Sequence, residues 1–295
     1  MRRLLLLVPV LFLSACNVFE GLGSDALSSD TEVLLSDGRS ALGNGNTGEA
    51  VRIFERAVES APSSTFNGRA ARLGLASAIL QRAGIDVLTL ERLVSNLDEV
   101  TNGTLASYTP PAGSVCSYGA GETVLGRIDL DQIDGYRVLR TNTAVLTRAQ
   151  GLITEALGLS ATATRAEIQA RIQALRAAGG DTSLLAGALA DGAIATIGIA
   201  YDRIVRAGGN DMTWVVLTSA GASSRYIGYC APAVAVRTRA ENETACAMPQ
   251  VDRAVTMVEV RAALFPAGSL AAEISTKARD GYKILERELT GTCAG

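Results

Sequence analysis

Apolar residues recur every three or four positions through most of the chain, and this spacing predicts helices rather than strands. Near the start of the regular pattern, it predicts two short helices over residues 32–43 and 48–61. The turn Gly45-Asn46-Thr47 separates them, and a proline, Pro62, follows the second. The chain therefore begins its folded part with a helical hairpin.

Two further helices are expected directly after this hairpin. One runs from a cap at Ser63 or Ser64 to Gly84, and Asp86 then caps a short helix over residues 87–97. The apolar positions of the longer helix share one face, so it is expected to pack against the hairpin. Residues 31–97 are thus interpreted as one helical unit.

Helical patterns resume in the second half of the chain, over residues 131–157, 251–264 and 269–289. Between them, Thr164 and Glu167 have the spacing of a capping box, and the helix that they open carries Ile168, Ile172 and Leu175 on one face. In such a box, the Ser or Thr side chain accepts a hydrogen bond from the backbone N–H three residues later, and the Glu side chain accepts one from the backbone N–H of the Ser or Thr. Residues 131–295 are therefore expected to form a helical body.

Residues 183–207 are almost entirely apolar or small, which makes the segment long enough to cross a membrane. An aspartate, Asp191, lies near its centre, and alanine and glycine are abundant around it. A carboxylate is costly in lipid, whereas small residues suit close helix packing. We therefore expect a central buried helix rather than a membrane span.

Two segments lack helical periodicity and are rich in Gly and Pro, namely residues 98–130 and 223–250. They are expected to be long irregular loops, and a domain boundary can lie in the first of them. The only tryptophan, Trp214, precedes the second and is expected in the core. The predicted fold class is all-α, with stacked helical hairpins in a larger helical array and two long disulfide-tied loops.

The small and large residues of the first hairpin resemble a tetratricopeptide repeat when Thr31 is counted as its first position. The matching positions are Leu34, Gly38, Ala41, Gly45, Ala50, Phe54, Ala57 and Pro62. Small residues at 38 and 50 let the two helices approach, and Phe54 fills the space towards the next hairpin. Asp37 departs from the pattern, since leucine is usual there. A second, degenerate unit is indicated by Leu73-Gly74 and Ala76; the alternative is an ordinary helical hairpin.

The tetratricopeptide resemblance implies a concave groove that holds a peptide or a partner protein. Transferred position by position, the groove-facing residues are Glu32, Leu35, Arg39 and Leu42 in the first unit and Asn67 and Ala71 in the second. The alternative is that these residues face other helices of the same chain.

The first sixteen residues have the layout of an export signal, with Arg2 and Arg3 before an apolar run that ends near Leu13. Leu13-Ser14-Ala15-Cys16 resembles a bacterial lipobox, which implies acylation (including palmitate) of Cys16 and cleavage before it. Residues 1–15 would be the signal peptide and 16–30 a lipidated tether. Two or three acyl chains anchor a protein durably. The alternative is a plain secretory signal with an incidental cysteine.

The residue after Cys16 is Asn17 rather than aspartate, which by the bacterial lipoprotein sorting rule favours the outer membrane, with the chain facing the periplasm. Loss of the two signal arginines would change the formal net charge from −3 to −5. The body itself would therefore not be drawn to anionic lipid.

The other four cysteines are Cys116, Cys230, Cys246 and Cys293, an even number that predicts two disulfides in an exported chain. Their spacing matches no metal-binding motif. Three pairings are open, and the sequence favours Cys230 with Cys246, which share one segment, leaving Cys116 to meet Cys293.

Composition argues against several function classes. The chain has no histidine, which removes the commonest general base and the commonest metal ligand. Its mild negative charge gives no basic footprint for nucleic acid. The carboxylates Asp129, Asp131 and Asp134 gather near a helix start, where they are expected to cap the helix rather than to form an acid pair or a calcium site.

The sequence therefore predicts no enzyme and no cofactor beyond the covalent lipid on Cys16. It predicts a lipid-anchored envelope protein that acts as a protein-interaction or assembly scaffold through a tetratricopeptide-like groove, with an envelope protein or peptide as its partner. The alternative is a periplasmic lipoprotein that binds a small or hydrophobic ligand in a helical pocket beside residues 183–207 and works with a transporter.

Overall fold

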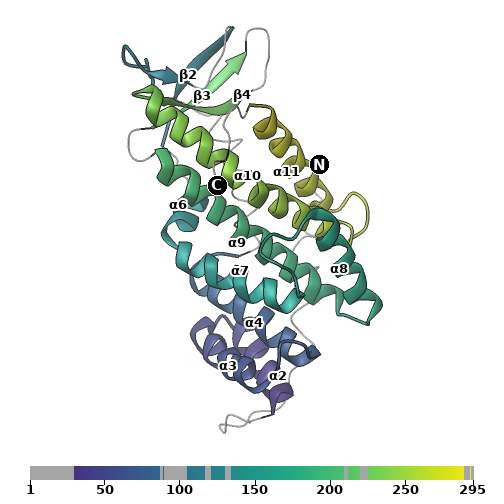
Figure 1. Cartoon of the computed structure of the whole chain (residues 1–295). Helices are drawn as coiled ribbons and strands as arrows, with labels where there is room; N and C mark the ends of the chain where they lie inside the picture. Colours follow the sequence, from purple (N-terminus) through teal and green to yellow (C-terminus); the bar gives the residue numbers. More distant parts are fainter. Residues whose placement is uncertain are drawn as a thin grey trace, which may run out of the picture.

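The computed structural model describes residues 30–86, 89, 105–116, 121–129, 134–208, 212–219, 225–288 and 293. Most of these residues are helical, and a small antiparallel sheet accompanies the helices. Helices α2, α3 and α4 form one end of the molecule and the sheet forms the other (Figure 1). The remaining helices connect these ends as a stack in which α4 packs on α7, α7 on α9, α9 on α10 and α10 on α11.

The N-terminal hairpin forms as its sequence predicts. Helices α2 (Thr31–Gly43) and α3 (Thr47–Ser60) meet at a turn in which Gly45 has a φ of 75°, a conformation that glycine adopts without strain. Asn46 caps α3 by accepting a hydrogen bond from the backbone N–H of Glu49. Helix α4 (Phe66–Arg82) follows, and its cap is Thr65 rather than Ser63 or Ser64.

Phe54 is the centre of this three-helix unit. Its side chain is only 1% exposed. A Cβ atom added to Gly38 on α2 would lie 2.8 Å from the ring, and one added to Gly74 on α4 would lie closer still. The phenylalanine of α3 therefore occupies space that two glycines on neighbouring helices leave open, and its ring touches both backbones.

The chain beyond α4 departs from a regular hairpin array. Asp86 accepts a hydrogen bond of 2.9 Å from the backbone N–H of Thr89, as a helix cap does, but the rest of the expected helix 87–97 lies outside the described residues. The next helices are α6 (Asp134–Thr141) and α7 (Thr143–Leu157), which are separated at Asn142. Helix α7 packs directly against α4 and so joins the N-terminal unit to the body.

Helices α8 (Arg165–Ala177) and α9 (Thr182–Gly208) follow the sequence prediction closely. The capping box of α8 forms, with both hydrogen bonds between Thr164 and Glu167 present. Helix α9 is central, since it contacts α4, α6, α7 and α10. It is long and apolar enough to cross a membrane by length and composition, but 67% of its most apolar stretch is buried inside the protein.

The expectation of a helical fold holds for most of the described residues, but the fold is not all-α, because strands also lie in regions that were predicted as irregular. The sheet consists of β1 (Val115–Cys116), β2 (Glu122–Ile128), β3 (Thr213–Ser219) and β4 (Arg225–Ala231), in the order β1-β4-β3-β2. All pairs are antiparallel. Trp214 is partly buried between the sheet and α10 rather than in the main core. Two strands therefore replace the expected loop 98–130 in part.

The second expected loop, 223–250, is also corrected. After β4, helix α10 (Val234–Ala262) begins 17 residues before the predicted start at 251 and carries Pro249 inside it. An internal proline costs a helix roughly 3 kcal/mol. Here α10 packs along α9 over much of its length, which offsets this cost. The last helix, α11 (Leu270–Glu288), packs on α10 as the second half of a hairpin.

Two disulfides form, as the even cysteine count predicts, but the favoured pairing is wrong. Cys116 pairs with Cys230, which joins β1 to β4 where the two residues lie opposite each other in the sheet. Cys246 pairs with Cys293, which joins α10 to the C-terminal tail. Closure of loops of 114 and 47 residues removes conformational entropy from the unfolded chain.

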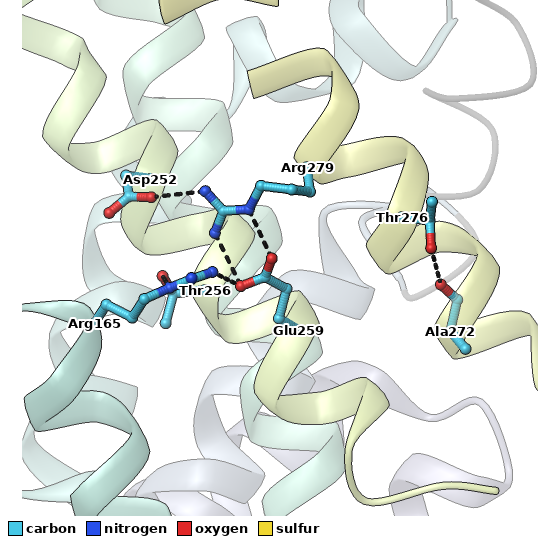
Figure 2. Close-up of polar contacts among 7 residues, drawn as sticks. All are labelled: Arg165, Asp252, Thr256, Glu259, Ala272, Thr276 and Arg279. Atoms are coloured by element: carbon cyan, nitrogen blue, oxygen red, sulfur yellow. Dashed lines mark hydrogen bonds and ion pairs between the residues drawn. The ribbon is translucent and has the colours of Figure 1, made fainter. Parts of the chain in front are cut away.

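Figure 2 shows a charged network that ties α8 and α11 to α10. Arg279 of α11 donates to both carboxylate oxygens of Glu259, at 2.6 and 2.9 Å, and to Asp252 at 3.2 Å. Arg165 of α8 forms an ion pair with the same Glu259 and reaches Thr256. Because one carboxylate serves two guanidinium groups, Glu259 is the centre of the network.

Replacement of Glu259 by glutamine is expected to lower the free energy of unfolding by about 1–3 kcal/mol, because the partly buried Arg279 and the more exposed Arg165 lose their shared counter-charge. Urea denaturation would measure this loss. The matched control is Glu243→Gln, which breaks the more exposed pair between Arg203 and Glu243. The control should cost less than about 1 kcal/mol, and equal losses for the two variants would contradict the assigned role of Glu259.

Candidate functional site

The residues predicted to line a groove on α2 and α4 are not exposed to the same degree. Glu32 and Arg39 are exposed on α2, and Leu42 and Asn67 are partly buried. Leu35 is 5% exposed and Ala71 is fully buried, and both belong to the main hydrophobic core. Those two side chains therefore contact other parts of this chain and are not available to a partner in this structure.

An open groove of about 410 Å³ lies instead on another side of the N-terminal unit, between α3, α4 and α7. Its apolar side chains come from all three helices: Val51 on α3, Ile79 on α4, Ala83 just after α4, and Val145 on α7. Val51 and Ile79 are 6% and 7% exposed, so they form a floor, while Val145 is more accessible. We call this feature the α3–α4–α7 groove.

The polar side chains of the α3–α4–α7 groove are Glu55, Arg82, Asn142 and Arg148. Arg148 on α7 donates to Glu55 on α3 at 2.7 Å, so these two charges cancel across the groove. Arg82 is exposed in the last turn of α4, and among the described residues it has no hydrogen bond or ion pair. Within the described part of the chain, one positive charge without a counter-charge therefore lies beside the apolar floor.

The start of α7 directly follows the end of α6, because only Asn142 separates the two helices. Asn142 is the N-cap residue, but its side chain makes no capping hydrogen bond; its amide nitrogen instead donates to the carbonyl of Val138 at 2.8 Å. A helix N-terminus carries a partial positive charge and unsatisfied N–H groups. The C-terminus of α6 carries the opposite partial charge at the same place, so the two helix ends oppose each other there and Arg82 is the positive group to consider at the groove.

A second polar cluster joins the N-terminal unit to the body. Asp191 of α9 is partly buried and accepts a hydrogen bond from Ser77 of α4, with Arg261 of α10 and Asp86 nearby. Burial is the main cause that raises the pKa of Asp191 to about 7, and the negative charge of Asp86 adds to it. Ser77 and Arg261 oppose the rise. The cluster joins α4, α9 and α10, and none of its four residues lines the α3–α4–α7 groove.

Two arginines hold the end of α7. Arg253 of α10 is 5% exposed and donates to the carbonyl of Ala161 and, at 3.2 Å, to Thr154. Arg171 of α8 donates to the carbonyl of Leu157 at 2.6 Å. Basic groups at a helix C-terminus satisfy free carbonyls and complement the helix dipole. We therefore interpret both arginines as structural, and burial lowers the pKa of Arg253.

Several sequence-predicted positions fall elsewhere. Cys16 and the lipobox lie outside the described residues. Of the acidic cluster, Asp129 is exposed, whereas Asp131 and the side chain of Asp134 are not described. Within the part of the chain that the structure describes, no group of three or more His, Cys, Asp or Glu side chains is placed to hold a metal ion.

Sequence reasoning did not find the α3–α4–α7 groove because it depends on α7, which lies more than fifty residues beyond α4 in the chain. Arg82 in the last turn of α4 was a local signal, but basic residues are common in the last turn of helices. Only the packing of α7 beside α4 places that arginine at a groove.

No family model, no curated protein and no solved structure matches this chain. The function therefore has to be argued from the residues and the geometry described above.

Proposed function

We propose that this chain is a lipid-anchored protein of the bacterial cell envelope whose N-terminal helices bind a partner protein and hold it at the membrane. The observation that carries the proposal is the packing of Phe54 between Gly38 and Gly74. Helix α2 contacts both α3 and α4, so the two glycine-bearing helices lie beside each other with the phenylalanine helix behind them. A tetratricopeptide-like hairpin followed by the first helix of the next would also bring small residues against a large one between neighbouring helices, which supports the proposal, and such units bind peptides and proteins.

The proposed anchor rests on the sequence alone. Two arginines, an apolar run and Leu13-Ser14-Ala15-Cys16 supply the order of features that lipoprotein processing needs. The two disulfides are consistent with an oxidising compartment outside the cytoplasm. A tether over residues 17–30 would then keep the N-terminal unit close to the lipid surface, since a flexible chain of this length spans roughly 20 Å.

The alternative of a small-ligand pocket beside α9 has less support. The middle of α9 is packed against its neighbours, with Leu189, Ala193, Ile194 and Ala195 fully buried. Neither the α3–α4–α7 groove nor a second hollow of the same volume beside the α7–α8 connection has a lining residue from α9 among the described residues. We therefore propose protein binding by the N-terminal unit and no ligand binding at α9.

Affinity capture of the full-length protein from detergent-solubilised envelope tests the proposal. We expect one or a few envelope proteins to copurify in fixed ratio, to be identified by mass spectrometry, and to capture this chain in the reciprocal experiment. The control bait is the segment 1–30 fused to an unrelated soluble domain, which would share the anchor but lack the helices. Two outcomes would contradict the proposed scaffold function. One is capture of the same proteins by both baits, and the other is copurification of a small molecule without any protein.

The same preparations test the anchor. Replacement of Cys16 by serine removes the thiol that would be acylated, so we expect the protein to leave the detergent-extracted membrane fraction or to remain unprocessed. Mass spectrometry of the wild-type N-terminus would detect the acyl chains. Membrane association through an acyl group in the Cys16→Ser variant would show that the lipobox interpretation is wrong.

A further inference from the structure

The α3–α4–α7 groove has the size and openness for a short extended segment rather than for a folded domain. Its volume of about 410 Å³ accommodates a few side chains. Three helices line it and one side is open, so an occupant would be buried on one face only. A segment of a larger protein can lie across such a surface and continue into solvent at both ends.

The floor of the groove selects for an aliphatic side chain. Val51 and Ile79 lie at the bottom and Val145 at the wall, with no aromatic ring among the lining residues. Apolar contact there would remove the exposed part of Val145 from water, which is favourable in proportion to the area buried.

The charges of the groove select for an acidic partner. The ion pair between Arg148 and Glu55 is neutral as a unit, whereas Arg82 is exposed and has no hydrogen bond or ion pair within the described part of the chain. A carboxylate placed beside the apolar floor would accept a charged hydrogen bond from Arg82.

We propose that the α3–α4–α7 groove binds a short peptide segment of an envelope protein that carries a carboxylate next to an aliphatic side chain. Arg82 receives the carboxylate, and the aliphatic side chain lies over Val51, Ile79 and Val145. This inference rests on the proposed scaffold function and names the chemistry of its partner.

A displayed library of random hexapeptides, selected on the full-length protein in detergent, tests this inference. We expect enrichment of sequences with Asp or Glu directly beside Leu, Ile or Val. The enriched peptide, labelled with fluorescein, should bind Arg82→Glu at least about tenfold more weakly, because the carboxylate would then meet a like charge. Fluorescence anisotropy gives the affinities, and Arg82→Gln should give an intermediate loss.

The matched control is Arg176→Glu. Arg176 is likewise an exposed arginine in the last turn of its helix, α8, but it lies outside the α3–α4–α7 groove. The Arg176→Glu variant should leave the affinity unchanged within about twofold, because the substituted residue lies outside the groove. It is matched to Arg82→Glu because both variants change the charge by the same amount in the last turn of a helix. Circular dichroism of both variants checks that the fold is retained.

Selection of basic or purely polar hexapeptides, selection of none, or equal losses for Arg82→Glu and Arg176→Glu would each overturn the inference. Failure of the proposed scaffold function can be distinguished from failure of the proposed peptide site. If envelope proteins copurify with the wild type and equally with Arg82→Glu, the scaffold stands and the groove is not its binding site. If no envelope protein copurifies with either, the scaffold fails.

Discussion

Replacement of Phe54 by alanine is expected to lower the free energy of unfolding by about 3–5 kcal/mol, the range for loss of a fully buried phenylalanine. The ring is 1% exposed and contacts the glycines of two neighbouring helices. Because Gly38 and Gly74 have no side chains to close the space, the cavity would remain open. Urea denaturation followed by circular dichroism gives the loss as a shift of the midpoint at constant slope.

The chain provides a matched control for this variant. Phe66 begins α4 and is 52% exposed, so Phe66→Ala removes the same side chain without opening a cavity and should cost less than about 1 kcal/mol. Similar losses for Phe54→Ala and Phe66→Ala would show that the packing of Phe54 against the two glycines does not hold the hairpin together. A second variant, Gly74→Leu, should also destabilise, since its side chain would occupy the position of the ring.

Replacement of Asp191 by asparagine is expected to change how stability depends on pH. Burial raises the pKa of Asp191 from an ordinary 3.8 to about 7 in the folded protein. Below about pH 4 the carboxyl group is protonated in both states. As the pH rises from about 4 to about 7, the unfolded chain loses this proton while the folded protein keeps it, so the wild type loses stability over this range.

Asparagine has no proton to lose, so the Asp191→Asn variant should lack this part of the pH dependence. The difference between variant and wild type should grow in favour of the variant by about 2–4 kcal/mol between pH 4 and pH 8, from about 1.4 kcal/mol per pKa unit. Denaturation in urea at several pH values would measure it. Asparagine can still hydrogen-bond to Ser77, so the contact between α9 and α4 is kept.

Asp37→Asn is the control for Asp191→Asn, because it removes a carboxylate of the same size from a partly exposed position on α2. Its stability should run parallel to that of the wild type across the same pH range. If Asp191→Asn also runs parallel to the wild type, the carboxyl group of Asp191 ionises as freely in the folded protein as in the unfolded chain, and the assigned burial of its charge is wrong.

Local sequence signals predicted the helices that depend on few distant contacts. The hairpin of α2 and α3 follows from helical spacing, the turn at Gly45 and the small residues opposite Phe54. The start of α8 follows from its capping box. These features lie within a few residues of one another, so local propensity and capping are enough to define them.

The sheet could not be predicted in the same way. β2 pairs with β3 although Glu122 and Ser219 are 97 residues apart, and β1 pairs with β4 over a similar separation. A two-residue strand such as Val115–Cys116 has no pattern of its own. Such strands form because partners from distant parts of the chain supply their hydrogen bonds, and this information is not local.

By itself, the sequence determined the helical hairpin around Phe54, the start of α8, the number of disulfides and the export-type N-terminus that motivates the proposed anchor. The tertiary structure alone decided the disulfide partners, the continuation of α10 through Pro249, the small sheet and the groove beside Arg82. The reason is physical: caps, turns and helical periodicity act between residues within a turn or two, whereas pairing, pocket formation and tolerance of a proline depend on which distant segments pack together.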